Sequence, residues 1–164
     1  RHNKKNISEL IKAANHFKNH KIWILPNNDA GSLIIRNEIE KKRELNNHVI
    51  NNLPREEYLS LIKNAKVVIG NSSSGVIETP SFQTASINIG NRQKDRIKAI
   101  STIDSTYKKS DIIKKIKLAI SKKFSNRLKK TKNPYGDGKA SEKILRILKD
   151  SKIDDKLLVK KMTI

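Results

Sequence analysis

Apolar residues recur along this chain at two spacings, one typical of amphipathic helices and one of short buried strands. The helices predicted from this spacing cover 7–17, 33–43, 54–65, 111–121 and 140–148, with a short one from Val76. The compact apolar runs that predict strands are KIWILP, HVIN, KVVIG, SINIG and 100–103. The run before Gly70 is typical of a strand buried on both faces. Strands that alternate with helices indicate βαβ units, so we predict an α/β fold with a doubly wound parallel sheet.

We expect one domain over residues 1–150, because 164 residues suit a single core and we see no repeat or low-complexity linker. A Lys-rich tail is expected over 151–164. The segment NPYGDG predicts a break before the last helix. We interpret the Lys-rich stretch 122–132 as a solvated surface segment. In a doubly wound sheet, ligands bind at the carboxyl ends of the strands, which directs attention to the loops there.

Composition changes this picture in two respects. The net charge of +20, from 36 Lys and Arg against 16 Asp and Glu, raises the alternative of a basic nucleic-acid-binding module. Aromatic residues make up only 4%, and the basic residues are spread along the chain, so we expect no nucleic-acid partner. The absence of Cys excludes a thiolate metal site, and we expect no metal and no cofactor. No signal peptide or membrane span is recognisable, so we expect a cytoplasmic protein and no membrane partner.

The loop NSSSG follows the apolar strand that ends near Gly70 and leads into a helix. Unpaired backbone N–H groups at a helix start bind anions, and serine hydroxyls add donors for a phosphate. Glu78 follows about one turn later, where a carboxylate can accept hydrogen bonds from two sugar hydroxyls. Phosphate donors followed by a diol acceptor indicate a nucleotide site.

Two other interpretations of the loop compete with a nucleotide site. A nucleophilic serine in a G-x-S-x-G elbow needs a glycine where Ser74 stands, and the four His residues offer no evident base. Alternatively, the serines only cap the helix. One serine suffices for a cap, so three in a row after a buried strand favour a ligand.

The segments GNSSSGVIETPSF and INIGNRQKDR resemble the C-terminal domain of the hydrolysing UDP-N-acetylglucosamine 2-epimerases. LPNNDAGS and NPYGDG occur in the same order as in that family, and the resemblance extends from about residue 6 to about residue 149. It implies one Rossmann-like half of a two-domain, glycosyltransferase-B-type architecture with UDP in the cleft. It also implies that the N-terminal domain is absent from this chain, which starts at Arg1 rather than Met, and that the full-length protein is a homo-oligomer.

The resemblance assigns roles to single positions of this sequence. Ser72 and Ser73 match the serines that hold the diphosphate, and Glu78 matches the acid on the uridine ribose. Arg92 matches an arginine at the nucleotide site, although it also fits a purely structural role at a helix end. Two further nucleotide contacts are implied, by Asn27 in the cleft and by the backbone of Leu53 at the uracil. Asn27 also fits a simple cap of its turn.

The sequence departs from the family at Gln83 and Ala85, where the family has Gly and Pro, and this concerns the turn into the next strand. The family's catalytic carboxylates and histidine come from the N-terminal part, so the catalytic residues here are unknown and we expect this fragment alone to be inactive. The function implied is hydrolysis of UDP-N-acetylglucosamine to UDP and N-acetylmannosamine for sialic-acid-type sugars. The alternatives are a 2-epimerase for a diacetamido-trideoxy UDP-sugar and the donor-binding domain of a glycosyltransferase.

Overall fold

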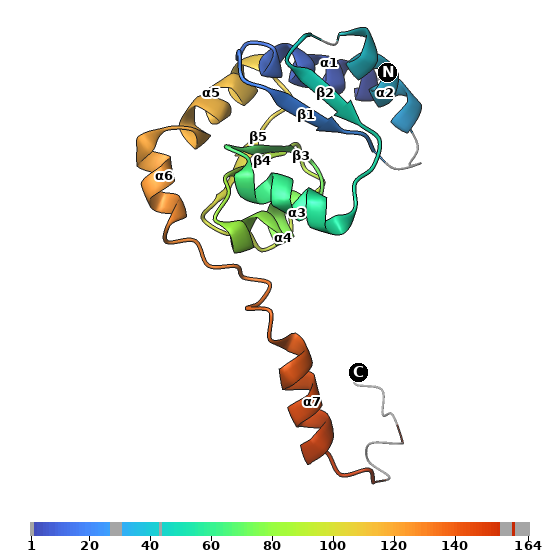
Figure 1. Ribbon diagram of the computed structural model, residues 1–164, viewed down its shortest axis with the longest axis vertical. Helices are drawn as coiled ribbons and strands as arrows, with labels where there is room; N and C mark the ends of the chain where they lie inside the picture. Colours follow the sequence, from blue (N-terminus) through green and yellow to red (C-terminus); the bar gives the residue numbers. More distant parts are fainter. Residues whose placement is uncertain (1, 27–30, 43, 155–158, 160–164) are drawn as a thin grey trace. The chain divides into compact units, whose positions relative to one another are not determined.

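The computed structural model describes residues 2–26, 31–42, 44–154 and 159, and the described chain forms two compact units. The first unit covers Arg1–Pro134 and contains the sheets and the candidate site (Figure 1). The second covers Tyr135–Ile164. The boundary expected at residue 150 stays a prediction.

The helices and strands follow the predicted order closely. The helices are α1 (His2–Ala14), α2 (Ser32–Lys41), α3 (Arg55–Asn64), α4 (Ser74–Ile77), α5 (Lys109–Ala119), α6 (Lys122–Leu128) and α7 (Ala140–Asp150), with a 3₁₀ turn, η1 (Thr79–Phe82). The strands are β1 (Lys21–Ile24), β2 (Asn47–Ile50), β3 (Val68–Gly70), β4 (Ser86–Ile89) and β5 (Thr102–Ser105). The last strand begins two residues later than expected, and α1 ends before Phe17, which packs against the core from the turn that follows.

The strands confirm the predicted α/β class with parallel pairing. They are hydrogen-bonded as two parallel sheets, β1–β2 and β3–β4–β5. The expectation that β3 is buried on both faces is wrong: its residues are only half-buried, because β3 is the edge strand of its sheet. β4 is the central strand, and all four of its residues are buried.

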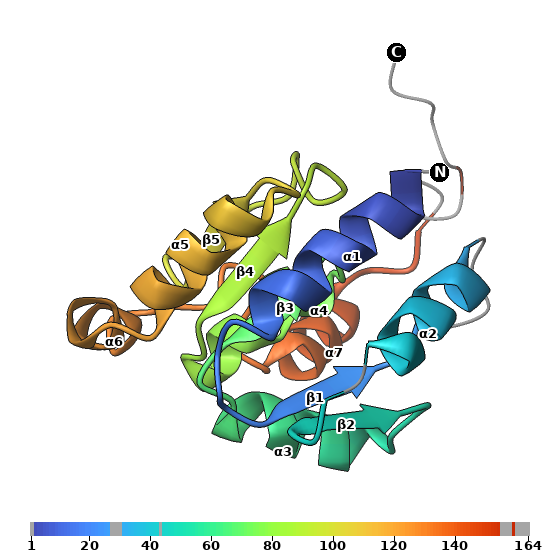
Figure 2. The same cartoon turned by 90° about the horizontal axis from the view of Figure 1, so that it is seen from above.

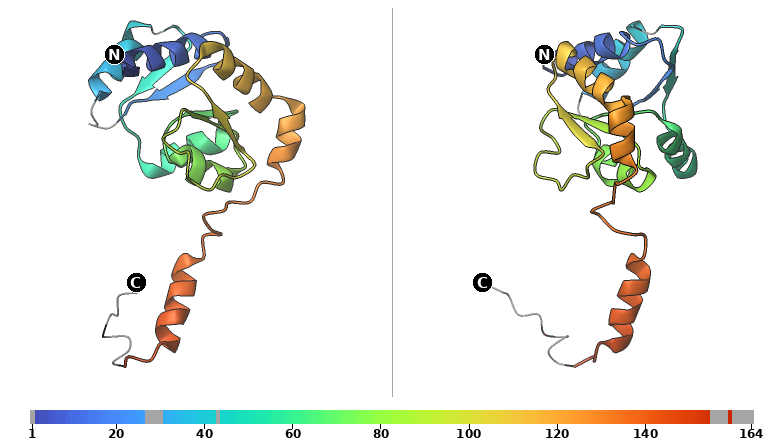
Figure 3. Two further views of the ribbon diagram at one scale, coloured as in Figure 1. Left: turned by 180° about the vertical axis from the view of Figure 1, so that it is seen from behind. Right: turned by 90° about the vertical axis from the view of Figure 1, so that its left-hand side faces the viewer.

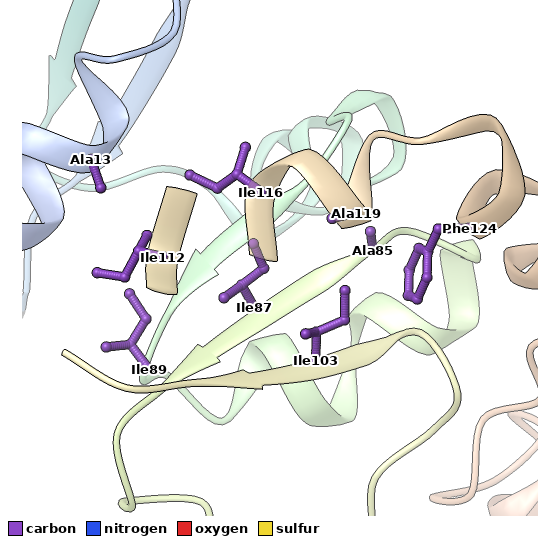
Figure 4. Packing of buried hydrophobic residues seen from close by; sticks show 9 residues of the cluster. All are labelled: Ala13, Ala85, Ile87, Ile89, Ile103, Ile112, Ile116, Ala119 and Phe124. Carbon is purple, nitrogen blue, oxygen red and sulfur yellow. The ribbon is translucent and has the colours of Figure 1, made fainter. Parts of the chain in front are cut away.

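Alternating side chains of β4 face two different helices. Ile87 and Ile89 belong to the larger core with Ile112 and Ile116 of α5 (Figure 4). Ser86, whose side chain alternates with that of Ile87, lies with its Cβ close to α4, where a Cβ built on Gly75 would be 3.8 Å from it. Helices therefore cover both faces of β4, as the prediction of a doubly wound arrangement requires.

A smaller core lies beneath α1 and α2. Its buried members are Ile7, Ile11, Leu25 and Ile39. α1 also contacts α5, so it lies beside both α2 and α5 (Figure 2). α5 in turn packs along β4 and β5, as the views from behind and from the side show (Figure 3). These contacts connect the two sheets of the first unit through their helices.

The start of α5 is held by the carboxylate of Asp111. The backbone N–H of Thr106 donates to Asp111 Oδ2 over 2.8 Å, and the Thr106 hydroxyl donates to the same oxygen over 3.0 Å. The backbone hydrogen bond from Thr106 lowers the pKa of Asp111 and outweighs the opposing effect of burial. Asp111 is therefore an ionised carboxylate that fixes the turn between β5 and α5.

The Lys-rich stretch 122–132 is largely exposed, as the sequence indicated, but part of it is helical. Its first part forms α6, whose cap is Ser121: the hydroxyl of this residue accepts from the Phe124 backbone N–H. The Phe124 side chain is 4% exposed and belongs to the larger core. Phe124, with the partly buried Leu128, thus anchors a helix whose other side chains are polar or charged and exposed.

The turn before β4 keeps a left-handed residue where the family usually has glycine. Gln83 has φ 53° and ψ 31°, a conformation that costs a side chain about 1–2 kcal/mol relative to the right-handed one. Gln83 also donates to the Lys129 carbonyl oxygen over 3.3 Å. Gln83 therefore adopts a left-handed conformation that a glycine would adopt without this cost.

The second unit contains α7, which is amphipathic. Ile144, Leu145, Ile147 and Leu148 are all more than half exposed within the described structure. Among the helices of the described residues, none combines the length and the apolar character that crossing a lipid bilayer requires.

Candidate functional site

The serine loop leaves the sheet at the carboxyl end of β3. β3 ends at Gly70, residues 71–73 form the loop, and α4 begins at Ser74. β3 and β4 are parallel neighbours with Gly70 opposite Asn88, so the loop after β4 leaves the same edge of the sheet. Two loops therefore meet where a doubly wound sheet binds its ligands.

The hydroxyls of Ser72 and Ser73 are the donors that this loop offers. Ser72 is exposed, and its Oγ accepts a long contact of 3.4 Å from the Ser74 N–H. The Ser73 hydroxyl has no hydrogen-bond partner within the described residues. The N–H groups of Gly75 and Val76 already bond to loop carbonyls. α4 has only four residues, so its dipole contributes less than the sequence argument assumed, and the hydroxyls contribute more.

Glu78 directly follows α4 and is held at both carboxylate oxygens. Ser74 Oγ donates to Oε2 over 2.5 Å, and Arg55 Nη1 donates to Oε1 over 3.1 Å. The Glu78 side chain is 22% exposed, so it is accessible from solvent. A carboxylate offers about four lone-pair positions, so about two remain for the hydroxyls of a diol.

The contact with Ser74 extends to α3. The Tyr58 hydroxyl is hydrogen-bonded to Ser74 Oγ, and Tyr58 lies one turn after Arg55 on the same helix. α3 therefore contacts Glu78 twice, directly through Arg55 and indirectly through Tyr58. Tyr58 is not among the site residues that the sequence predicted.

Arg92 lies in the turn after β4, with its side chain exposed and without a hydrogen bond or ion pair in the described part of the chain. Its neighbour Gln93 is 3% exposed and donates from Nε2 to the Asn71 carbonyl oxygen over 2.9 Å. This bond fastens the turn that carries Arg92 to the serine loop. Sequence reasoning singled out Arg92 and missed Gln93.

The other two predicted positions differ in what the structure says of them. Leu53 is half-buried, lies two residues before Arg55, and its N–H donates to Asn52 Oδ1 over 2.9 Å. It thus adjoins the helix that holds Glu78. Asn27 lies outside the described residues.

The carboxylate of Asp104 lies near the same edge of the sheet but is committed to other partners. Asn88 Nδ2 donates to its Oδ1 over 2.7 Å, and Lys98 Nζ is 2.8 Å from both oxygens. Burial raises the pKa of Asp104, but the hydrogen bonds from Asn88 and Lys98 outweigh this and leave the pKa lowered. An ionised carboxylate paired in this way is a poor general acid.

Comparisons with known proteins agree with the geometry. Residues 1–149 match the protein family described as UDP-N-acetylglucosamine 2-epimerase. Polysialic acid biosynthesis protein P7 of Escherichia coli is 39% identical over 147 residues, which is 88% of this chain and 38% of that protein. GDP/UDP-N,N'-diacetylbacillosamine 2-epimerase (hydrolyzing) of Campylobacter jejuni is 42% identical over 105 residues, which is 62% of this chain and 27% of that protein.

The fold has a counterpart among solved structures. UDP-GlcNAc 2-epimerase of Methanocaldococcus jannaschii, in complex with UDP-GlcNAc and UDP, superposes with a TM-score of 0.72 at 21% identity, over 90% of this chain and 41% of that one. The chain therefore spans about two fifths of the length of that protein, and the likeness agrees with a glycosyltransferase-B-type fold class. Because the family match covers nearly the whole chain, this protein belongs to the UDP-N-acetylglucosamine 2-epimerase family.

Proposed function

We propose that this chain is the UDP-binding part of a hydrolysing 2-epimerase that acts on UDP-N-acetylglucosamine. In this proposal Ser72 and Ser73 bind the diphosphate, Glu78 accepts the ribose hydroxyls and Arg92 adds a cation at the phosphates. Asn27 in the cleft and the backbone of Leu53 at the uracil complete the nucleotide site. The observation that carries the proposal is the pairing of two serine hydroxyls, which donate to no partner within the described residues, with an anchored, half-buried carboxylate about one turn away.

The charges of the site suit this division of labour. Glu78 repels a phosphate, so a diphosphate is favoured at the serine end of the loop and a neutral sugar at the Glu78 end. Arg55 offsets part of the negative charge of Glu78 over 3.1 Å. Arg92 is exposed and uncommitted within the described structure, which leaves its guanidinium available to an anion.

The reaction proposed for the full-length enzyme eliminates UDP across C1 and C2 of the sugar and then adds water with inversion at C2. The products are UDP and N-acetylmannosamine, a precursor of sialic-acid-type sugars. The similarity to a polysialic acid biosynthesis protein supports this substrate. The similarity to a diacetylbacillosamine 2-epimerase supports the second candidate, a diacetamido-trideoxy UDP-sugar. Homo-oligomerisation of the full-length protein stays a prediction.

Calorimetry with two ligands tests the ribose assignment. Glu78→Ala removes the diol acceptor, so we expect UDP binding to weaken far more than inorganic pyrophosphate binding. The matched control is Glu57→Ala, which removes an exposed glutamate from α3 and changes neither affinity. Equal losses for UDP and pyrophosphate would refute the ribose role of Glu78.

Proton exchange tests whether the chemistry needs residues beyond this chain. Because the family's hydration step takes a proton from solvent at C2, we would follow the C2 signal in deuterated water by NMR. We expect no deuterium at C2 and no N-acetylmannosamine from the 164-residue chain alone. Deuterated manno product, formed at a rate proportional to protein, would show that the chain holds its own base.

A further inference from the structure

Glu78 is the end of a hydrogen-bonded relay that begins on a different helix. The Tyr58 hydroxyl bonds to Ser74 Oγ, and Ser74 Oγ lies 2.5 Å from Glu78 Oε2. The other oxygen of Glu78 accepts from Arg55 over 3.1 Å. Both oxygens of one carboxylate are therefore held, Oε1 by Arg55 of α3 and Oε2 by Ser74, which in turn is bonded to Tyr58 of α3.

Counting protons fixes the direction of the relay. An ionised carboxylate only accepts hydrogen bonds, so the single Ser74 hydroxyl proton points to Glu78. Ser74 then has only lone pairs to offer Tyr58, and the Tyr58 hydroxyl must be the donor. The order is Tyr58 O–H to Ser74 Oγ, then Ser74 O–H to Glu78 Oε2. Replacing Tyr58 by Phe removes the first donor and leaves Ser74 free to turn to other acceptors.

Glu78 needs such support because of where it lies. It follows a helix of only four residues, and a glutamate side chain has several rotatable bonds whose ordering opposes binding. Contacts at both oxygens select one orientation before the ligand arrives. The lone pairs that remain are then fixed in direction, which suits two adjacent hydroxyls on a sugar ring.

We propose that Tyr58, through Ser74, and Arg55 are positioning residues that orient Glu78 and thereby set selectivity for an intact ribose diol over deoxyribose. The inference rests on the proposed ribose role of Glu78. It adds that this selectivity depends on α3, which begins two residues after Leu53, so the segment proposed to contact the uracil and the helix that orients Glu78 are adjacent in the chain.

Calorimetry of the 164-residue chain with UDP and with its 2′-deoxy and 3′-deoxy analogues tests the proposal. Tyr58→Phe removes one hydrogen bond of the relay, so it should weaken UDP binding about two- to ten-fold. The affinity for the deoxy analogue that lacks the hydroxyl facing Glu78 should change little. Arg55→Ala should act in the same direction. The matched control is Tyr107→Phe, because the Tyr107 hydroxyl has no hydrogen-bond partner within the described residues.

A double-mutant cycle separates positioning from structure. In a Glu78→Ala background, Tyr58→Phe should have no further effect on selectivity, because it acts only through Glu78. If Glu78→Ala abolishes selectivity, two results would overturn the inference and leave the ribose assignment standing. One is an equal loss of affinity for all three ligands, and the other is a selectivity that Tyr58→Phe and Arg55→Ala leave unchanged. If Glu78→Ala leaves selectivity intact, the ribose assignment itself fails, and the inference fails with it.

Discussion

Replacing Gln93 with Met tests whether the turn after β4 holds the serine loop in place. Gln93 is 3% exposed and donates to the Asn71 carbonyl oxygen over 2.9 Å. Methionine has a similar length and no donor, so Gln93→Met removes this bond and leaves the packing largely intact.

The expected stability change is small because two effects oppose each other. Losing a neutral hydrogen bond costs about 0.5–1.5 kcal/mol, and Asn71 is exposed, so water can replace the donor at its carbonyl. Gln93 Oε1, however, is buried without a partner in the described residues, and removing such an oxygen recovers about 1–3 kcal/mol. The central values give a net gain of about 1 kcal/mol, so we expect the free energy of unfolding to stay unchanged or to rise slightly.

UDP binding should weaken although the fold is not destabilised. Without its tether the serine loop samples more conformations, and the ordering cost then opposes binding, so we expect about a three- to ten-fold loss of UDP affinity. Thermal unfolding and calorimetric titration of the same samples measure both quantities. The matched control is Gln83→Met, at an exposed glutamine outside the loop. A sharp fall in melting temperature with unchanged UDP affinity would show that Gln93 serves only the fold.

Three further substitutions test other parts of the account. Arg92→Ala should cost about 1.5–3 kcal/mol of UDP binding with little change in melting temperature, whereas Lys94→Ala, two residues away, should leave UDP binding unchanged. A fall in melting temperature with unchanged UDP affinity in Arg92→Ala would show that Arg92 is structural. Gln83→Gly should raise the free energy of unfolding by about 1 kcal/mol, because glycine adopts φ 53° without strain, and a decrease in thermal melts would contradict this. The lowered pKa of Asp111 contributes stability that is complete above the unfolded value of about 3.9 and is lost as pH falls through the folded value. Asp111→Asn should therefore destabilise at neutral pH and converge with the parent chain in acid, and a constant difference across pH would refute this.

Apolar spacing was enough to predict most of the fold. The positions Ile112 and Ile116 recur at helical spacing, and both face the core from α5. Helix α6 was missed because it is short and has only two apolar residues, Phe124 and Leu128, which are too few to establish a period. The burial of β3 was overestimated because burial depends on neighbouring strands, which a local apolar run does not specify.

The candidate site was only partly predictable, for a similar reason. Ser74 and Glu78 are four residues apart, so their contact is readable from helical spacing once the loop is noticed. Tyr58 reaches Ser74 from 16 residues away, and Gln93 reaches Asn71 from 22 residues away. Contacts of that range depend on how helices and loops pack, and no spacing in the sequence encodes them.

An NMR titration of the 15N-labelled chain with UDP tests the central claim most directly. The account predicts saturable shifts of the backbone amides of Ser72, Ser73, Glu78 and Arg92. The Leu53 amide should also shift, because UDP carries the uracil. Inorganic pyrophosphate should reproduce the shifts at the two serines and Arg92 but not those at Glu78 and Leu53. Shifts confined to the lysines of α6, or the absence of any saturable shift in the serine loop, would contradict the assignment of this chain as a UDP-binding domain.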